Sequence, residues 1–203
     1  MAHIAILGLG NWGTAVARMW LLEGHKVKGW TIEQEVYESI TMDGINKKYL
    51  PDHSVEGLEA TMRIEEALDG VEIVVLAVPS SVILDVVDDI IPHLRPGHVL
   101  IDLAKGLAPG KRLISEAINE KLVAAKKSNT LAVVTGPTSA PEAAGGVITT
   151  ALVASEDESV AKRLAETLTT QTFILHSASD PVGAELWGAF KNAIALTCGL
   201  VDG

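Results

Sequence analysis

The residue of this chain with the clearest chemical character is Lys191, which lies in an otherwise apolar helical segment. No other charged residue occurs between Glu185 and Asp202. At helical spacing its neighbours include Trp187 and Ile194, and none of them carries an opposite charge. An ammonium group in apolar surroundings is costly unless a partner or a substrate meets it. Because the pKa of such a lysine shifts readily, we expect Lys191 to act as an acid, a base or an anion anchor.

A second feature with chemical meaning is the glycine loop Gly8-Leu-Gly10-Asn-Trp-Gly13, which follows an apolar run and precedes a helical segment. This context is typical of a dinucleotide site. Gly8 permits a tight turn, Gly10 lets backbone N–H groups approach a pyrophosphate, and Gly13 allows close helix–strand packing. The alternative is that the glycines only turn the chain.

The elements that must position these residues alternate between short apolar runs and amphipathic helical segments. The pattern predicts strands at residues 4–7, 26–30, 73–77, 99–103, 131–134, 148–154 and 172–175. It predicts helices at residues 12–23, 32–41, 82–91, 111–124, 156–168 and 186–201. Several runs are apolar on both faces, as in a parallel sheet covered by helices. We therefore expect an α/β fold with a doubly wound, Rossmann-type, mainly parallel sheet.

In such sheets the ligand lies beyond the carboxyl ends of the strands, so the residues after each run are the candidate site. Pro79 follows one run, where it either contacts the dinucleotide or only separates a strand from a helix. Lys105, followed by Gly106, comes after the next run. The segment from Val134 to Glu142 is rich in hydroxyl groups and is either a substrate loop or a plain turn.

The choice between NAD and NADP stays open in the sequence. An acidic residue after the second strand favours NAD, and an arginine favours NADP. The residues there are Thr31, Ile32 and Glu33. Glu33 either accepts a hydrogen bond from the ribose or is a first-turn acid of the next helix.

Composition narrows the function further. The net charge of −10 argues against a nucleic-acid partner, because phosphate contacts need clustered Lys and Arg. The single cysteine, Cys198, fits a reducing compartment, and no targeting signal or membrane span stands out, so we expect a cytoplasmic protein. The six histidines show no metal-ligand spacing, and we expect no metal site.

Taken together, these segments resemble the bacterial-type NAD(P)-dependent glycerol-3-phosphate dehydrogenase family, and the resemblance runs along the whole chain. The matching pieces are Gly8-Leu-Gly-Asn-Trp-Gly-Thr-Ala, Asn46-Lys-Lys-Tyr-Leu-Pro51, Val78-Pro79-Ser80, Lys105-Gly106, Gly136-Pro137-Thr138, Gly183-Ala-Glu-Leu, Lys191-Asn192 and Asp202-Gly203.

The resemblance implies reversible hydride transfer between NAD(P)H and dihydroxyacetone phosphate, which gives sn-glycerol 3-phosphate as a phospholipid precursor. It implies that Lys191 is the general acid and base, that Lys105 orients the substrate and contacts the cofactor, and that Asn192 supports the site. The remaining implied contacts are Gly136 and Thr138 with the substrate, and Gly8, Gly10, Asn11, Trp12, Gly13, Pro79 and Ala140 with the dinucleotide.

The chain departs from the family pattern at several positions. Ile32 stands where the family often has Arg or His, which weakens the case for NADP. Ser139 stands for the usual Phe, Pro141 for a frequent Lys, and Trp187 for the usual Gly near Lys191. Family members also continue past Gly203 into a helical domain that supplies further substrate contacts.

These observations predict a dinucleotide-binding domain at residues 1–179 and the beginning of a helical substrate domain at residues 180–203. We expect the chain alone to bind its cofactor better than it turns over substrate, and its apolar last helix to favour a homodimer or poor solubility. The alternatives are a non-catalytic NAD(P)-binding module or truncated paralogue, and a similarly built β-hydroxyacid or ketopantoate-type dehydrogenase.

Overall fold

The computed structural model describes residues 1–202, apart from the side chains of Asn192 and Asp202. Its centre is an eight-stranded sheet with the order β3-β2-β1-β4-β5-β6-β7-β8. All neighbouring strands run parallel except β6 and β7, which are antiparallel. The strands are β1 (His3–Leu7), β2 (Lys26–Trp30), β3 (Glu59–Thr61), β4 (Ile73–Leu76), β5 (Val99–Asp102), β6 (Leu131–Thr135), β7 (Thr149–Ser155) and β8 (Phe173–Ala178). The expected doubly wound, mainly parallel sheet is confirmed.

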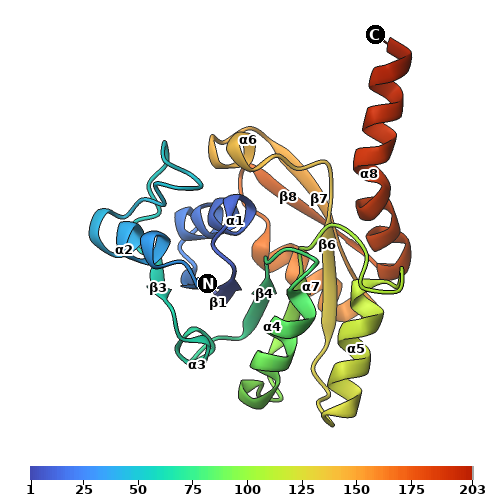
Figure 1. Ribbon diagram of the computed structural model, residues 1–203, viewed down its shortest axis with the longest axis horizontal. Helices are drawn as coiled ribbons and strands as arrows, with labels where there is room; N and C mark the ends of the chain where they lie inside the picture. The colour runs from blue at the N-terminus through green and yellow to red at the C-terminus, as the bar shows by residue number, and fades with distance from the viewer. Residues whose placement is uncertain (203) are drawn as a thin grey trace.

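Helices cover both faces of the sheet (Figure 1). Along β1, the side chains of Ile4 and Ile6 join one hydrophobic core, and those of Ala5 and Leu7 join the other. This alternation follows from the two-residue period of a strand. The first core contains α1 (Asn11–Leu22) and α7 (Glu158–Leu168), and the second contains α4 (Ile83–Ile90) and α5 (Ile114–Ala124).

The remaining helices also pack on this sheet and its covering helices. They are α2 (Gln34–Asp43), α3 (Ile64–Ala67), the 3-10 helix η1 (Ile91–His93), α6 (Ala140–Ala144) and α8 (Pro181–Asp202). Of these, α2, α3 and α6 each add a residue or two to the cores. The strand β3 and the short helices α3 and α6 are missed by the sequence prediction, because three to five residues carry too little periodicity. The helix predicted at residues 111–124 begins only at Ile114, because Lys111 has a left-handed φ of 62° in the preceding turn.

The last helix, α8, packs against β6 and β7 with its first turns and then projects away from the sheet (Figure 1). Among residues 1–202, no helix is both long and apolar enough to cross a membrane. The strand order reverses between β2-β1 and β4, so a ligand crevice is expected beyond the carboxyl ends of β1 and β4.

Candidate functional site

The glycine loop joins β1 to α1. Its backbone packs so closely at Gly8 and Gly13 that no side chain fits at either position. A Cβ atom at Gly13 would lie 1.9 Å from the carbonyl oxygen of Gly8, and Gly8 itself has a φ of 108°. Neither position therefore accepts a side chain without a backbone shift. Gly10 precedes α1, and no side chain caps that helix end in the described part of the chain. Its backbone N–H groups are thus available to an anion, which the helix dipole also favours.

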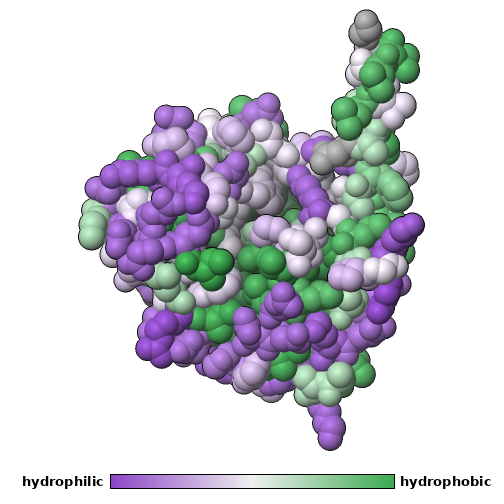
Figure 2. Space-filling model, in the orientation of Figure 1, coloured by the Kyte–Doolittle hydropathy of each residue, from purple (hydrophilic) through white to green (hydrophobic). Residues whose placement is uncertain are grey.

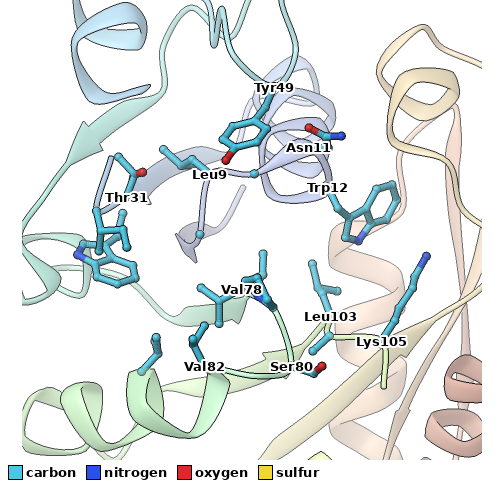
Figure 3. Close-up of a pocket in the computed structure, with 18 of the residues that line it drawn as sticks. Leu9, Asn11, Trp12, Thr31, Tyr49, Val78, Ser80, Val82, Leu103 and Lys105 are labelled. Carbon is cyan, nitrogen blue, oxygen red and sulfur yellow. The ribbon is translucent and has the colours of Figure 1, made fainter. Parts of the chain in front are cut away.

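This loop forms one wall of a cavity of about 930 Å³ at the carboxyl ends of β1 and β4 (Figure 3). Most of the residues predicted to contact the dinucleotide line it, namely Gly8, Gly10, Asn11, Trp12, Pro79, Lys105 and Ala140. Gly13 does not line the cavity and instead lies against Gly8. The volume, the glycine turn and the uncapped helix end all fit an extended anionic ligand.

Lys105 lies at one side of this cavity. Its Nζ atom donates a hydrogen bond to Thr138 Oγ1 at 3.2 Å and lies 5.8 Å from the centre of the Trp12 ring. Loss of hydration lowers the pKa of Lys105 below its ordinary value, and the positive charge of Lys191 lowers it further. The loop that carries Lys105 passes so close to the Pro79 loop that a Cβ at Gly106 would lie 3.1 Å from Ser80 Oγ.

Lys191 lines a second, smaller cavity of about 280 Å³, together with Gly136, Trp187 and His176. Neighbouring residues of the loop after β6 line both cavities: Gly136 and Pro137 line the smaller one, and Thr138 lines the larger. Lys105 and Lys191 therefore line adjoining cavities, and they lie close enough for the charge of Lys191 to lower the pKa of Lys105. Trp187, at 69% exposure, forms part of the outer wall of the smaller cavity.

Glycines set two close approaches here. A Cβ at Gly188 of α8 would lie 2.3 Å from Thr135 Oγ1 at the end of β6, and a Cβ at the next residue, Gly136, would lie 2.7 Å from the carbonyl oxygen of Thr150 in β7. The helix that carries Lys191 thus packs closely on the end of the strand that leads into the loop predicted to contact the substrate. Asn192 follows on the same helix, but its side chain lies outside the described residues, so its supporting role stays a prediction.

Two buried carboxyl groups near the site were not identified from the sequence. Glu185, 3% exposed, accepts hydrogen bonds from the backbone N–H of Ile114 at 2.5 Å and from Ser115. Asp102, at the end of β5, accepts from the N–H of Ala104 at 2.7 Å, while its Oδ2 atom has no partner among the described residues. Burial raises the pKa of Asp102 to about 7 against the opposing effect of that hydrogen bond, and the charge of Glu185 adds to the increase.

Glu33, which the sequence left between two interpretations, lines the larger cavity. Its carboxylate accepts hydrogen bonds from Tyr49 Oη at 2.8 Å and from Lys48 Nζ at 2.5 Å. Both partners belong to the segment Asn46–Pro51, one of the pieces that carry the family resemblance. Among the described residues, no group of three or more His, Cys, Asp or Glu side chains could hold a metal ion.

Comparison with known proteins places this sequence and fold in a family. A sequence profile of the N-terminal part of NAD-dependent glycerol-3-phosphate dehydrogenase matches residues 3–161. The chain belongs to this family. A glycerol-3-phosphate dehydrogenase (NAD(P)+) from Exiguobacterium sp. is 40% identical over 205 residues, which cover 100% of this chain and 60% of that protein. One from Halothermothrix orenii is 36% identical over 99% of this chain and 58% of its own length.

Solved structures agree with this membership. The crystal structure of glycerol-3-phosphate dehydrogenase from Coxiella burnetii matches with a TM-score of 0.89 and 33% identity, over 99% of this chain and 61% of that one. An imine reductase from Streptomyces aurantiacus, at 16% identity and a TM-score of 0.72, shares the fold alone. This member of the glycerol-3-phosphate dehydrogenase family spans about 60% of the length of the curated relatives it matches.

Proposed function

We propose that this chain is the dinucleotide-binding part of an oxidoreductase that interconverts sn-glycerol 3-phosphate and dihydroxyacetone phosphate with NAD(P)(H). The observation that carries the proposal is the cavity between the glycine loop and Lys105, in a chain whose family profile covers residues 3–161. Such a reaction would serve phospholipid precursor synthesis in the cytoplasm.

The residues around the larger cavity suit a nicotinamide dinucleotide. The N-terminus of α1 and the backbone at Gly10 would hold the pyrophosphate, and Trp12, Pro79 and Ala140 would bound the rest of the molecule. When bound, the nicotinamide ring supplies a hydride to C2 of dihydroxyacetone phosphate or accepts one from C2 of glycerol 3-phosphate.

The two lysines have separate tasks in this proposal. During reduction, Lys191 gives a proton to the C2 oxygen of the substrate, and during oxidation it takes that proton back. Lys105, held by Thr138, polarises and orients the substrate with its positive charge. Gly136 and Thr138 line the path between the lysines, where the substrate would contact backbone and hydroxyl groups. Asn192 would support Lys191.

The domain boundary belongs to this proposal as well. Residues 1–179 contain every strand of the sheet, and residues 180–203 would begin a helical substrate domain. A homodimer is proposed too, because α8 exposes Leu186, Phe190 and Ile194.

Calorimetry with NADH and an assay of dihydroxyacetone phosphate reduction test the activity, with a full-length curated relative as the positive control. We expect Lys191→Ala to lower turnover by at least about a hundredfold, as for loss of an acid–base group, and to leave dinucleotide binding unchanged. Lys162→Ala, which removes an exposed lysine of α7, is the matched control.

The outcomes separate the alternatives. Undiminished turnover in Lys191→Ala would contradict the assigned role of Lys191. If the unchanged chain binds NADH without any turnover, that result fits either a non-catalytic binding module or a part of a larger enzyme, and Lys191→Ala is then made in the full-length relative at the matching lysine. Absence of both NADH and NADPH binding would refute the proposed function itself.

A further inference from the structure

The rim of the larger cavity at the end of β2 carries a carboxylate held by a lysine and a tyrosine. We infer that this cluster, made of Glu33, Lys48 and Tyr49, makes the site selective for NAD(H) over NADP(H). The inference deepens the proposed function, because it rests on the same dinucleotide site and names which of the two cofactors that site accepts.

Two hydrogen bonds hold the Glu33 carboxylate in the cluster. One carboxylate oxygen accepts from Tyr49 Oη at 2.8 Å and the other from Lys48 Nζ at 2.5 Å. Lys48 also contacts Glu35 on the outer side. Each carboxylate oxygen can accept more than one hydrogen bond, so Glu33 keeps acceptor capacity toward a ligand.

The segment that carries Lys48 and Tyr49 is itself tied to the glycine loop. The buried side chain of Asn46 donates hydrogen bonds to the carbonyl oxygen of Leu9 at 2.8 Å and to Thr14 Oγ1 at 2.8 Å. Its own oxygen accepts from the N–H of Tyr49 at 3.2 Å. The position of Glu33 is therefore set relative to the loop that would bind the pyrophosphate.

The cluster is negatively charged at neutral pH. The hydrogen bond from Lys48 lowers the pKa of Glu33, burial opposes this effect, and the hydrogen bond from Tyr49 lowers the pKa further. Glu33 and Glu35 carry two negative charges and Lys48 one positive charge, which leaves one net negative charge. Both carboxylates are partners of Lys48, so its ammonium is already engaged.

This charge distinguishes the two dinucleotides. The 2′-hydroxyl of an adenosine ribose can donate to a carboxylate at the end of the second strand, whereas a 2′-phosphate there meets a like charge. Sites for the phosphate offer an arginine, but this strand end carries the buried Thr31 and the apolar Ile32, which is 74% exposed. Among the described lining residues the one cation is Lys105, which lies on the opposite side of the cavity from Thr31 (Figure 3).

Titration of the chain with NADH and with NADPH, by calorimetry at fixed ionic strength, tests the inference without any turnover. We expect NADH to bind at least about tenfold more tightly than NADPH, since tenfold corresponds to a modest like-charge penalty. Glu33→Gln should bring the two affinities to within about threefold, mainly by tightening NADPH. Glu35→Gln, which removes a partner of Lys48 outside the cavity lining, should retain most of the preference.

Two further variants keep the test decisive. Ile32→Arg should tighten NADPH, because a guanidinium group would then be available to the phosphate. Lys48→Met should weaken NADPH no more than NADH if Lys48 serves only Glu33. Circular dichroism and thermal unfolding confirm that each variant is folded before it is titrated.

Equal affinity for both dinucleotides, or tighter NADPH binding by the unchanged chain, would overturn the inference and leave the proposed function standing. A selective loss of NADPH affinity in Lys48→Met would also overturn it, because Lys48 would then be a phosphate anchor. If neither dinucleotide binds, the proposed function fails together with the inference.

Discussion

At the scale of single residues, Asp102 shows most clearly how burial changes chemistry in this chain. Its carboxyl group is fully buried at the end of β5, and one of its oxygen atoms lacks a partner among the described residues. Charging such a group is costly, so its pKa lies at about 7 against an ordinary value of 3.8. The folded chain therefore holds a proton that the unfolded chain releases between these two values.

This difference predicts how stability depends on pH. A raised pKa in the folded state favours folding fully below about pH 4, and this contribution is lost as the pH rises through about 7. We expect Asp102→Asn to reduce the decline in the free energy of unfolding between pH 4 and 8 by up to a few kcal/mol. Urea titrations at several pH values measure this free energy of unfolding. The control is Asp89→Asn, at an exposed position of α4. An unchanged pH profile in Asp102→Asn would contradict this assignment.

At the scale of elements, a contact between α8 and α5 adds to the packing of α8 on β6 and β7. Leu113, the residue before α5, has no side-chain oxygen that could cap the N-terminus of this helix. Glu185 of α8 instead accepts hydrogen bonds from the first backbone N–H groups of α5, those of Ile114 and Ser115. A carboxylate at a helix N-terminus is favoured by both hydrogen bonding and the helix dipole. Since Lys191 follows Glu185 on the same helix, this contact and the close approach at Gly188 fix its position beside Thr135 and Gly136.

Removal of the Glu185 cap should destabilise the folded chain and leave the nucleotide cavity unchanged. We expect Glu185→Ala to lower the free energy of unfolding by about 1–3 kcal/mol, because buried N–H groups of α5 lose their acceptor. Glu185→Gln, which keeps an acceptor oxygen, should cost less, and Glu166→Ala on the exposed face of α7 should cost little. Denaturant unfolding gives these values. NADH affinity should stay constant throughout, and a large loss of affinity in Glu185→Ala would show that the effect is not confined to α8 and α5.

At the scale of the whole molecule, α8 is an apolar projection on an otherwise acidic protein. Figure 2 shows hydrophobic residues along the helix where it leaves the body of the molecule. The exposed fractions are 52% for Phe190, 70% for Leu196 and 82% for Leu200. Burial of such exposed apolar surface is energetically favourable. A second copy of the chain presents the same surface and could cover it.

We therefore expect the 203-residue chain to self-associate as its concentration rises. Light scattering across a concentration series measures the mass. A Phe190→Ser, Leu196→Ser double variant should shift association to higher concentration, because less apolar surface is buried. Leu22→Ser at an exposed position of α1 is the matched control. A mass that stays monomeric at high concentration would count against both this expectation and the proposed dimer.

Much of the fold was predictable because its signals are local. The apolar runs of β1, β4 and β5 each appear as a few successive residues, and the glycine loop marks the turn into α1. The short strand β3 was not predictable, since its three residues are partly exposed and have no alternating pattern. The start of α5 was placed too early because the turn at Lys111 depends on backbone geometry that composition does not encode.

The sequence by itself determined the order of the elements, the family and the residue types available at the strand ends, because each of these is written in short stretches of chain. Only the tertiary structure decided which of these residues meet. Glu185 reaches the N–H of Ile114 across 71 positions, and Glu33 is held by Tyr49 across 16. Such pairs depend on how helices pack on the sheet, and packing is a property of the whole core and not of any segment.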